Sequence, residues 1–223
     1  MRVMVIAAHP DDETLGCGGT LLSHLKAGDE THWLIVTRIC ENLGYSAARV
    51  SKRQEEIKRV AAEYRFTTIH ELGFYTAMLD TVPIVDLIAK ISRVFSEVSP
   101  EIVYTVFEGD HHTDHRIVSS AVASSTKWFR IPSIRRILAY ETLSETGIVQ
   151  NFQGKTFGPT SYYDIGEFLD RKIEIMNIYK SEIGDFPFPR SDKAIRYIAA
   201  MRGAQAGFEA AEAFILLRER IYG

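Results

Sequence analysis

The sequence predicts an α/β fold in which a mostly parallel sheet is covered by helices on both faces. Two observations predict it. Short apolar runs recur through the first half of the chain, and stretches with apolar residues at helical spacing separate them. Strands that alternate with helices in this way form a parallel sheet with right-handed crossovers. We therefore expect a Rossmann-like arrangement, followed by a less regular C-terminal third.

Four apolar runs in the first half of the chain are the expected parallel strands. The first, RVMVIAA, is short and bounded by a turn signal, which is typical of a strand buried on both faces. The other three runs have the same character. Together the four cover residues 2–8, 31–39, 67–74 and 101–107.

Helices are expected between these strands. Acidic residues after the first strand favour a helix N-terminus there, and this helix should end at Gly28. The next two helices are expected near residues 50–64 and 83–98, and Pro83 suits the first turn of the latter.

The final third of the chain has a weaker pattern. It predicts a strand over residues 135–142 and helical segments near 167–180 and 191–219. The polar, glycine-containing stretch 144–161 between them is interpreted as a hairpin or as a lid near the active site.

Size and composition fit a single domain over residues 1–223, with 46% hydrophobic and 25% charged residues. A net charge of -3 argues against a general nucleic-acid binder.

No apolar stretch is long enough to span a bilayer and no signal-peptide pattern is present, so we expect a cytoplasmic protein. Cys17 and Cys40 lack a CxxC spacing, which fits a reducing compartment.

Two polar clusters follow expected strands. HPDDE (9–13) comes directly after the first strand, and EGDHHTDH (108–115) comes after the fourth. Because ligands of open α/β sheets bind outside the carboxyl ends of the strands, we expect the two clusters to meet in space.

A metal site fits these clusters. Catalytic zinc commonly has three protein ligands and keeps one position for water, and His9, Asp12 and a histidine of the second cluster satisfy this count. Asp11 lies between the first two and could accept a proton from that water. Either cluster alone is more typical of a capped turn or a polar loop. Their joint position at strand ends is what favours a metal site.

The combination resembles the LmbE/PIG-L family of zinc-dependent N-deacetylases. The resemblance depends on AHPDDE after an N-terminal strand and on HTDH in the second cluster, supported by GCGGTL, KRQEE and the closing RGAQAGFEAAEAF. It covers nearly the whole chain. It implies a hydrolase that removes an N-acetyl group from an amino sugar or amino-sugar conjugate, by attack of a zinc-bound water on the amide carbonyl.

The resemblance also implies a role for individual residues. His9, Asp12 and His115 would bind Zn²⁺, and Asp11 would be the general base. His112 would stabilise the oxyanion or protonate the leaving amine.

Three further residues are candidates with open alternatives. Asp114 would orient a ligand imidazole, or would cap a helix. Arg53, in KRQEE, would bind the substrate, or would form an ion pair with Glu55 or Glu56 on the helix surface. Arg38 is placed at the end of the second strand, where it would face the crevice.

Several points stay open. Some family members have Pro-Asp-Gly after the third strand, where this chain has YTAMLD (75–80), and some have a Tyr where this chain has Asp110. The identity of the N-acetylated sugar is therefore not predicted. Two other functions remain: a non-catalytic sugar- or nucleotide-binding α/β module, and an Fe²⁺ enzyme that uses the same two histidines and one carboxylate. A homo-oligomer is also left open.

Overall fold

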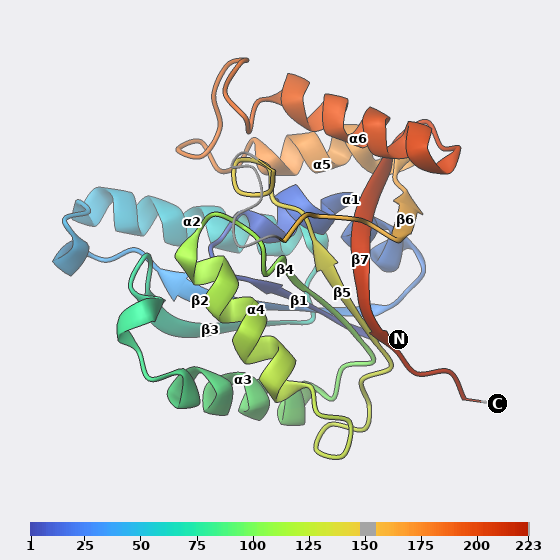
Figure 1. Cartoon of the computed structure of the whole chain (residues 1–223). Helices are drawn as coiled ribbons and strands as arrows, with labels where there is room; N and C mark the ends of the chain where they lie inside the picture. Colours follow the sequence, from blue (N-terminus) through green and yellow to red (C-terminus); the bar gives the residue numbers. More distant parts are fainter. Residues whose placement is uncertain (148–154, 223) are drawn as a thin grey trace.

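The computed structural model describes residues 1–147 and 155–222 and has one central sheet. The strands are β1 (Arg2–Ala7), β2 (Glu30–Arg38), β3 (Thr68–Tyr75), β4 (Ile102–Val106), β5 (Arg136–Tyr140), β6 (Ser161–Asp164) and β7 (Ala211–Glu219). Their order across the sheet is β3-β2-β1-β4-β5-β7-β6 (Figure 1). The first five strands are parallel, whereas β7 is antiparallel to both β5 and β6. The predicted fold class is confirmed.

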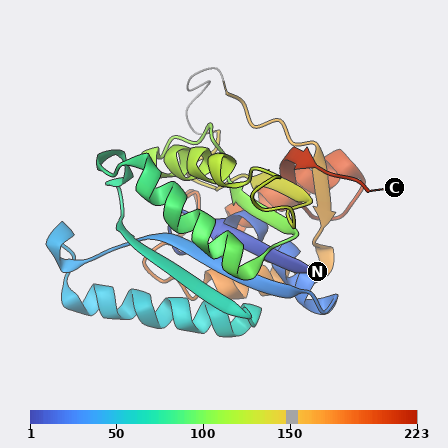
Figure 2. The same cartoon turned by 90° about the horizontal axis from the view of Figure 1, so that it is seen from below.

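Helices cover both faces of this sheet. They are α1 (Asp12–Lys26), α2 (Ala47–Tyr64), α3 (Ile84–Val98), α4 (Thr113–Ser125), α5 (Leu169–Met176) and α6 (Asp192–Ala206). Helices α3 and α4 pack together on one face, and α1 and α2 lie on the other (Figures 1 and 2). Helix α5 packs on α1, and α6 packs on α5 and β7. Among the described helices none is long and apolar enough to cross a membrane.

The central strands are apolar because helices cover them on both sides. Every residue of β4, and every residue of β1 after Arg2, is buried. Between these two neighbours the chain order of the sheet reverses, since β2 and β3 extend it to one side and β5 extends it to the other. In open α/β sheets the crevice at such a reversal is where ligands bind.

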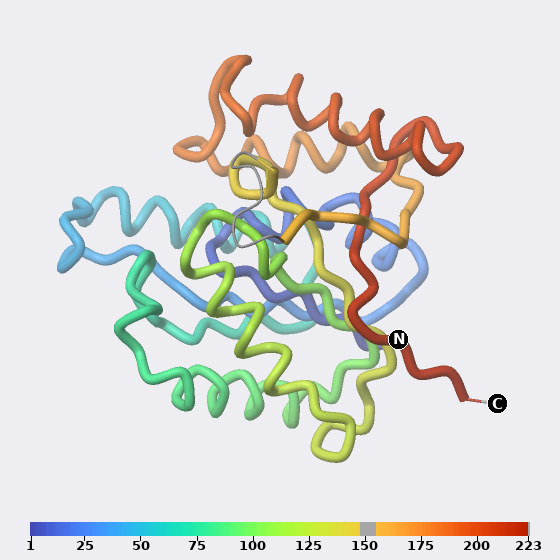
Figure 3. The backbone as a smooth tube through the Cα atoms, in the orientation of Figure 1, coloured from blue at the N-terminus to red at the C-terminus, as the bar shows by residue number. Residues whose placement is uncertain are grey.

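The helix predicted over residues 191–219 is wrong in its second half. Helix α6 ends at Ala206, and Gly207 adopts a left-handed conformation with φ 79° that directs the chain back to the sheet. Residues 211–219 then form β7 between β5 and β6, as the path of the backbone shows (Figure 3). A short apolar run such as AFILL does not distinguish strand from helix by periodicity alone.

One helix was not predicted from the sequence, and one predicted segment is only partly described by the structure. Helix α4, which begins inside the second polar cluster, was not predicted. The proposed hairpin or lid over residues 144–161 includes residues 148–154, which lie outside the described residues, and β6 begins only at Ser161.

Helix α1 is interrupted by a non-helical residue, Cys17, with φ -144° and ψ 25°. Beside this break the Gly19 N–H donates to Glu212 at 2.8 Å, and the Leu15 carbonyl accepts from Lys172 at 2.8 Å. In a continuous helix these two backbone groups would bond to each other. Lys172 and Glu212 also bond to one another at 2.7 Å and are both buried. A buried ion pair from α5 and β7 therefore replaces one helical hydrogen bond.

Candidate metal centre

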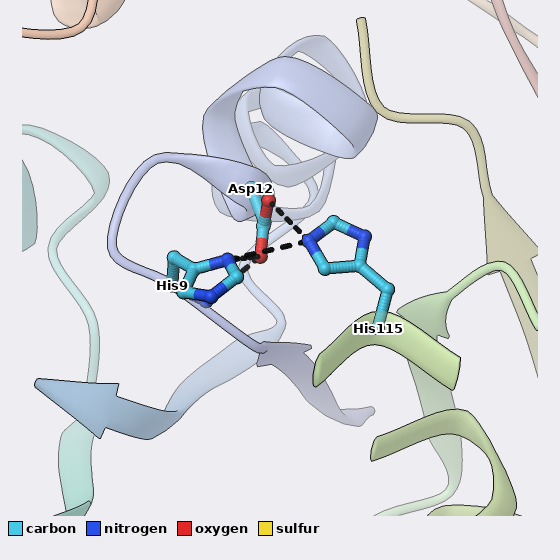
Figure 4. A group of neighbouring side chains, drawn as sticks. All are labelled: His9, Asp12 and His115. Carbon is cyan, nitrogen blue, oxygen red and sulfur yellow. Dashed lines mark hydrogen bonds and ion pairs between the residues drawn. The ribbon is translucent and has the colours of Figure 1, made fainter. Parts of the chain in front are cut away.

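Three predicted ligands meet at the carboxyl ends of β1 and β4. His9 follows β1, Asp12 begins α1 and His115 lies in the first turn of α4, and the three side chains point toward one another (Figure 4). His115 Nε2 is 3.3 Å from His9 Nδ1 and 3.4 Å from Asp12 Oδ1, and His9 Nδ1 is 3.7 Å from Asp12 Oδ2. One ligand atom from each residue lies within 4.8 Å of the other two. Two imidazole nitrogens and one carboxylate at this spacing fit a zinc or ferrous ion.

The turn after β1 brings Asp12 back toward His9. Asp11 has φ 134°, a conformation that non-glycine residues rarely adopt and that costs on the order of 1–3 kcal/mol. The His9 N–H donates to Asp12 Oδ2 at 2.8 Å and closes this turn. Backbone strain is thus concentrated where it orients a candidate metal ligand.

Each candidate histidine ligand has a carboxylate on the side away from the other two candidate ligands. His9 Nε2 is 3.0 Å from Asp114 Oδ2, and His115 Nδ1 is 2.8 Å from Asp110 Oδ2. These contacts orient both rings and leave His9 Nδ1 and His115 Nε2 as the nitrogens that could bind an ion. Asp114 therefore lies where the orienting role needs it, and the side chain that caps α4 is His112.

Asp110 was not among the predicted site residues. It is fully buried, and its other oxygen accepts a hydrogen bond from Thr146. The signal was available in the sequence, because Asp110 lies five residues before His115 in the same polar cluster.

A second group of ligand atoms, from His9, His112 and Asp114, meets the same spacing criterion. Several of its ligand atoms already take part in hydrogen bonds. The Asp114 carboxylate accepts the N–H groups of Ala77 at 2.7 Å and Leu79 at 3.3 Å, and His112 Nδ1 accepts the Asp114 N–H at 3.1 Å. The first group is therefore the better metal site.

The charges of the first group favour a cation. Burial alone would raise the pKa of Asp12, but His115 and His9 hold that pKa well below its usual range. Burial would likewise lower the pKa of His115, but Asp12 and Asp110 raise it well above its ordinary value. The pocket between Asp12 and Asp110 thus stabilises positive charge at His115.

Asp11 lies beside this group and is almost completely buried, with 4% of its surface exposed. Burial and the neighbouring Asp12 raise its pKa to about 7, although Arg190 opposes the shift. Arg190 donates to Asp11 Oδ2 at 2.7 Å. A carboxyl group that titrates near neutral pH can both accept and release a proton during turnover.

His112 is one of the residues that line the cavity. Burial, with smaller effects from His9 and His115, lowers its pKa to about 4, so the imidazole is neutral at pH 7. Its Nδ1 accepts the Asp114 N–H, so the ring proton is on Nε2. His112 lines the cavity beside the candidate ligands as a neutral hydrogen-bond donor.

A cavity of about 180 Å³ opens at this centre. Its walls come from the turn after β1, from the segment between β2 and α2, and from the segment after β5. The C-terminal third contributes Glu182 and Arg190. Neither residue was predicted, because no local pattern connects them to motifs that lie far away in the sequence.

Arg53 lies in the cavity wall with its donors turned toward the protein. It donates to the Pro10 carbonyl at 3.0 Å, to Ser181 Oγ at 2.9 Å and to Glu182. Its Nε also lies 3.1 Å from a carboxylate oxygen of Glu56. The ion-pair alternative is thus present in the structure, and a direct contact with substrate stays a prediction.

The chain matches a known family over residues 4–126. The sequence model for the PIG-L family, described as GlcNAc-PI de-N-acetylase, matches residues 4–126, which include all three candidate ligands and Asp11. The chain belongs to this family. The resemblance seen in the sequence is thereby confirmed.

The similarity to two curated relatives covers more of the chain than the family match does. The chain is 24% identical over 194 residues to a probable N-acetyl-α-D-glucosaminyl L-malate deacetylase 2 of Bacillus cereus, and the alignment covers 81% of this chain and 83% of that protein. It is 26% identical over 222 residues to the diacetylchitobiose deacetylase of Thermococcus kodakarensis, covering 95% of this chain and 81% of that protein.

Solved structures show the same fold. A conserved protein from Thermus thermophilus has a TM-score of 0.80 and 23% identity, covering 99% of this chain and 96% of that one. GalB of Pseudomonas putida, a 4-carboxy-2-hydroxymuconate hydratase, has a TM-score of 0.74 and 18% identity, covering 100% of this chain and 98% of that one. The second example shows that this fold alone does not determine the reaction.

Proposed function

We propose that this PIG-L family member is a zinc-dependent deacetylase that hydrolyses the N-acetyl group of an amino sugar or amino-sugar conjugate. The products are acetate and a free amine. The observation that carries the proposal is the convergence of His9, Asp12 and His115 on one cavity, with Asp11 beside them. The family and the names of both curated relatives support the reaction type.

The protein residues supply the proton transfers. A zinc ion held by the three ligands would lower the pKa of a water and polarise the amide carbonyl. Asp11 would accept the proton as the water oxygen bonds to the carbonyl carbon. The same carboxyl would then deliver this proton to the nitrogen as the C–N bond breaks, which its pKa of about 7 allows.

His112 would stabilise the charge that develops on the carbonyl oxygen. His112 lines the cavity, and the hydrogen bond that its Nδ1 accepts at the start of α4 holds the ring. A preorganised donor of this kind typically contributes about 3 kcal/mol to transition-state stabilisation. Arg190 would hold Asp11 in position through their 2.7 Å contact.

The two alternatives from the sequence have less support. A non-catalytic binding module needs neither a buried base near neutral pKa nor carboxylates behind both histidines. Iron remains chemically compatible with the ligand set, so the metal is part of the test.

The test is a screen of N-acetylated sugars and conjugates with the zinc-loaded protein, measuring released acetate. For an active substrate, Asp11→Asn should lower kcat by about 10²- to 10⁴-fold while bound zinc, measured by elemental analysis, stays unchanged. Asp86→Asn is the matched control, because Asp86 lies on α3, away from the cavity. Turnover that survives Asp11→Asn would refute the assigned mechanism. Acetate release by the zinc-loaded protein is then compared with that of the protein reloaded with Fe²⁺ in the absence of oxygen, which shows which of the two metals supports turnover.

A further inference from the structure

The cavity continues from the metal centre to the segment between β2 and α2. There its wall includes Arg38 at the end of β2, Tyr45, and Arg49 in the first turn of α2. This region lies outside the catalytic group, so it would contact a part of the substrate other than the N-acetyl group.

Two of the four arginines that line the cavity are neutralised by carboxylates. Arg53 is paired with Glu182 and Glu56, and Arg190 donates to both Asp11 and Glu182. The positive charges of Arg53 and Arg190 are therefore balanced by carboxylates of the protein itself.

Within the described part of the chain, neither of the other two arginines has a carboxylate partner closer than 3.9 Å. Within the described part of the chain, no carboxylate lies within ion-pair distance of Arg38, whose guanidinium lies 5.9 Å from the Tyr75 ring. Arg49 is half exposed and 3.9 Å from a Glu182 oxygen that binds Arg53 more closely. Both guanidinium groups thus keep donors for a ligand.

The N-terminus of α2 adds positive potential at the same place. Ser46 caps this helix by accepting the Arg49 N–H at 3.3 Å, and the first turn contains no acidic residue. A cation in the first turn is unfavourable next to the positive end of the helix dipole, and a bound anion would offset both charges.

We propose that the substrate carries an anionic oxygen group, a carboxylate or a phosphate, and that Arg38 and Arg49 bind it while the N-acetyl group lies at the metal centre. This inference rests on the proposed deacetylase function. The forked guanidinium donors match the oxygens of either group. Besides Asp11, Asp12 and Glu182, the cavity wall contains one more carboxylate, that of Glu145, in the segment after β5.

The test compares three substrates of the zinc-loaded enzyme by acetate release. Methyl N-acetyl-α-glucosaminide is neutral, N-acetylglucosamine 1-phosphate carries a phosphate, and N-acetyl-α-glucosaminyl L-malate carries carboxylates. We expect a higher kcat/KM for at least one anionic substrate. Arg38→Gln and Arg49→Gln should each lower the anionic-to-neutral ratio of kcat/KM by about tenfold, chiefly through KM. The anionic substrate with the larger anionic-to-neutral ratio of kcat/KM shows whether the charged group is a carboxylate or a phosphate.

The control is Arg93→Gln on α3, since Arg93 is exposed, pairs with Glu97 and lies outside the cavity lining. It should leave the ratio unchanged. A neutral substrate that is used as well as both anionic ones, with a ratio unaffected by Arg38→Gln and Arg49→Gln, overturns the inference. Acetate release in that experiment would still support the deacetylase function.

A binding measurement separates the two proposals if no acetate appears. Calorimetry on the zinc-loaded Asp11→Asn protein compares the malate conjugate and the phosphate with the methyl glycoside. Tighter binding of an anionic ligand, lost in a variant that also carries Arg49→Gln, supports the anion site by itself. Equal affinities for the charged and neutral ligands contradict it.

Discussion

At the scale of single residues, the candidate centre depends on side chains behind the ligands as much as on the ligands. Asp114 and Asp110 contact the outward nitrogens of His9 and His115, and both carboxylates are buried. A carboxylate that accepts the imidazole N–H fixes the ring and makes the opposite nitrogen a stronger ligand. Removing that charge should therefore weaken metal binding without removing a ligand.

Asp110→Asn tests this role. The amide oxygen can still accept the His115 N–H, but without the negative charge, so zinc affinity should fall by about tenfold. Competition with a chromogenic chelator measures the change. Asp80→Asn is the control, because Asp80 is exposed on the short helix Leu79–Thr81. Equal zinc affinity in Asp110→Asn and the unmodified protein would show that Asp110 has no part in metal binding.

His24 predicts a pH dependence of stability far from the metal centre. It is buried in the last turn of α1, between Asp29 at 2.7 Å and the Tyr104 hydroxyl at 2.9 Å. Burial lowers its pKa below 6.5, although Asp29 opposes the shift. The unfolded chain therefore binds a proton at a higher pH than the folded one. This contribution to stability is complete above about pH 6.5 and is lost as the pH falls toward the folded pKa.

The comparison is between the protein and His24→Gln, by urea unfolding from about pH 8 to about pH 5, a range that spans the ordinary histidine pKa. The variant should be less stable at the alkaline end, because it loses two buried contacts, but its free energy of unfolding should fall less on acidification. His32 and His70, whose pKa values burial also lowers, are present in both proteins and cancel in the difference. Parallel pH profiles would contradict the assignment to His24.

At the scale of elements, the break in α1 depends on Lys172 and Glu212. Lys172→Met would leave the Glu212 carboxylate buried with backbone N–H partners but without its cation. Breaking a buried pair from one side typically costs about 3–5 kcal/mol, and we expect a loss of that size in the free energy of unfolding.

Lys26→Met is the matched control for Lys172→Met. Lys26 pairs with Glu167, but both side chains are more than 60% exposed, so the expected loss is below about 1 kcal/mol. Chemical unfolding measures both. Similar small losses in the two variants would mean that the buried pair does not stabilise the interrupted helix.

The elements also show how far the sequence predicts the fold and the site. Strands β1 to β4 and the helices between them lie within a few residues of their expected positions, because strands buried on both faces and helices with one apolar face have distinct patterns. The strand β7 was predicted as helix, since only its pairing with β5 and β6 decides its conformation. The candidate ligands come from two local motifs, whereas Arg190 reaches Asp11 only through the tertiary fold.

At the scale of the whole molecule, the candidate centre joins separate parts of the fold. His9 and Asp12 follow β1, and His115 follows β4, on the two sides of the point where the sheet order reverses. The C-terminal third adds Arg190 at the base, and its Lys172 and Glu212 bond to the helix that begins with Asp12. A bound ion would therefore cross-link segments that are far apart in the sequence, and unfolding would have to release it.

Zinc should consequently raise the stability of the folded protein by mass action. At a free zinc concentration of about 100 times Kd, the free energy of unfolding should increase by about 2.7 kcal/mol, and a chelator should reverse the increase. His115→Gln should abolish most of this response, because it removes a ligand that links α4 to the turn after β1. His70→Gln is the control, since His70 lies on the edge strand β3, outside the cavity. Thermal unfolding at several zinc concentrations measures the effect. A zinc response that is equal in His115→Gln and His70→Gln would place the ion elsewhere, whereas a response lost only in His115→Gln would assign it to the reversal point of the sheet.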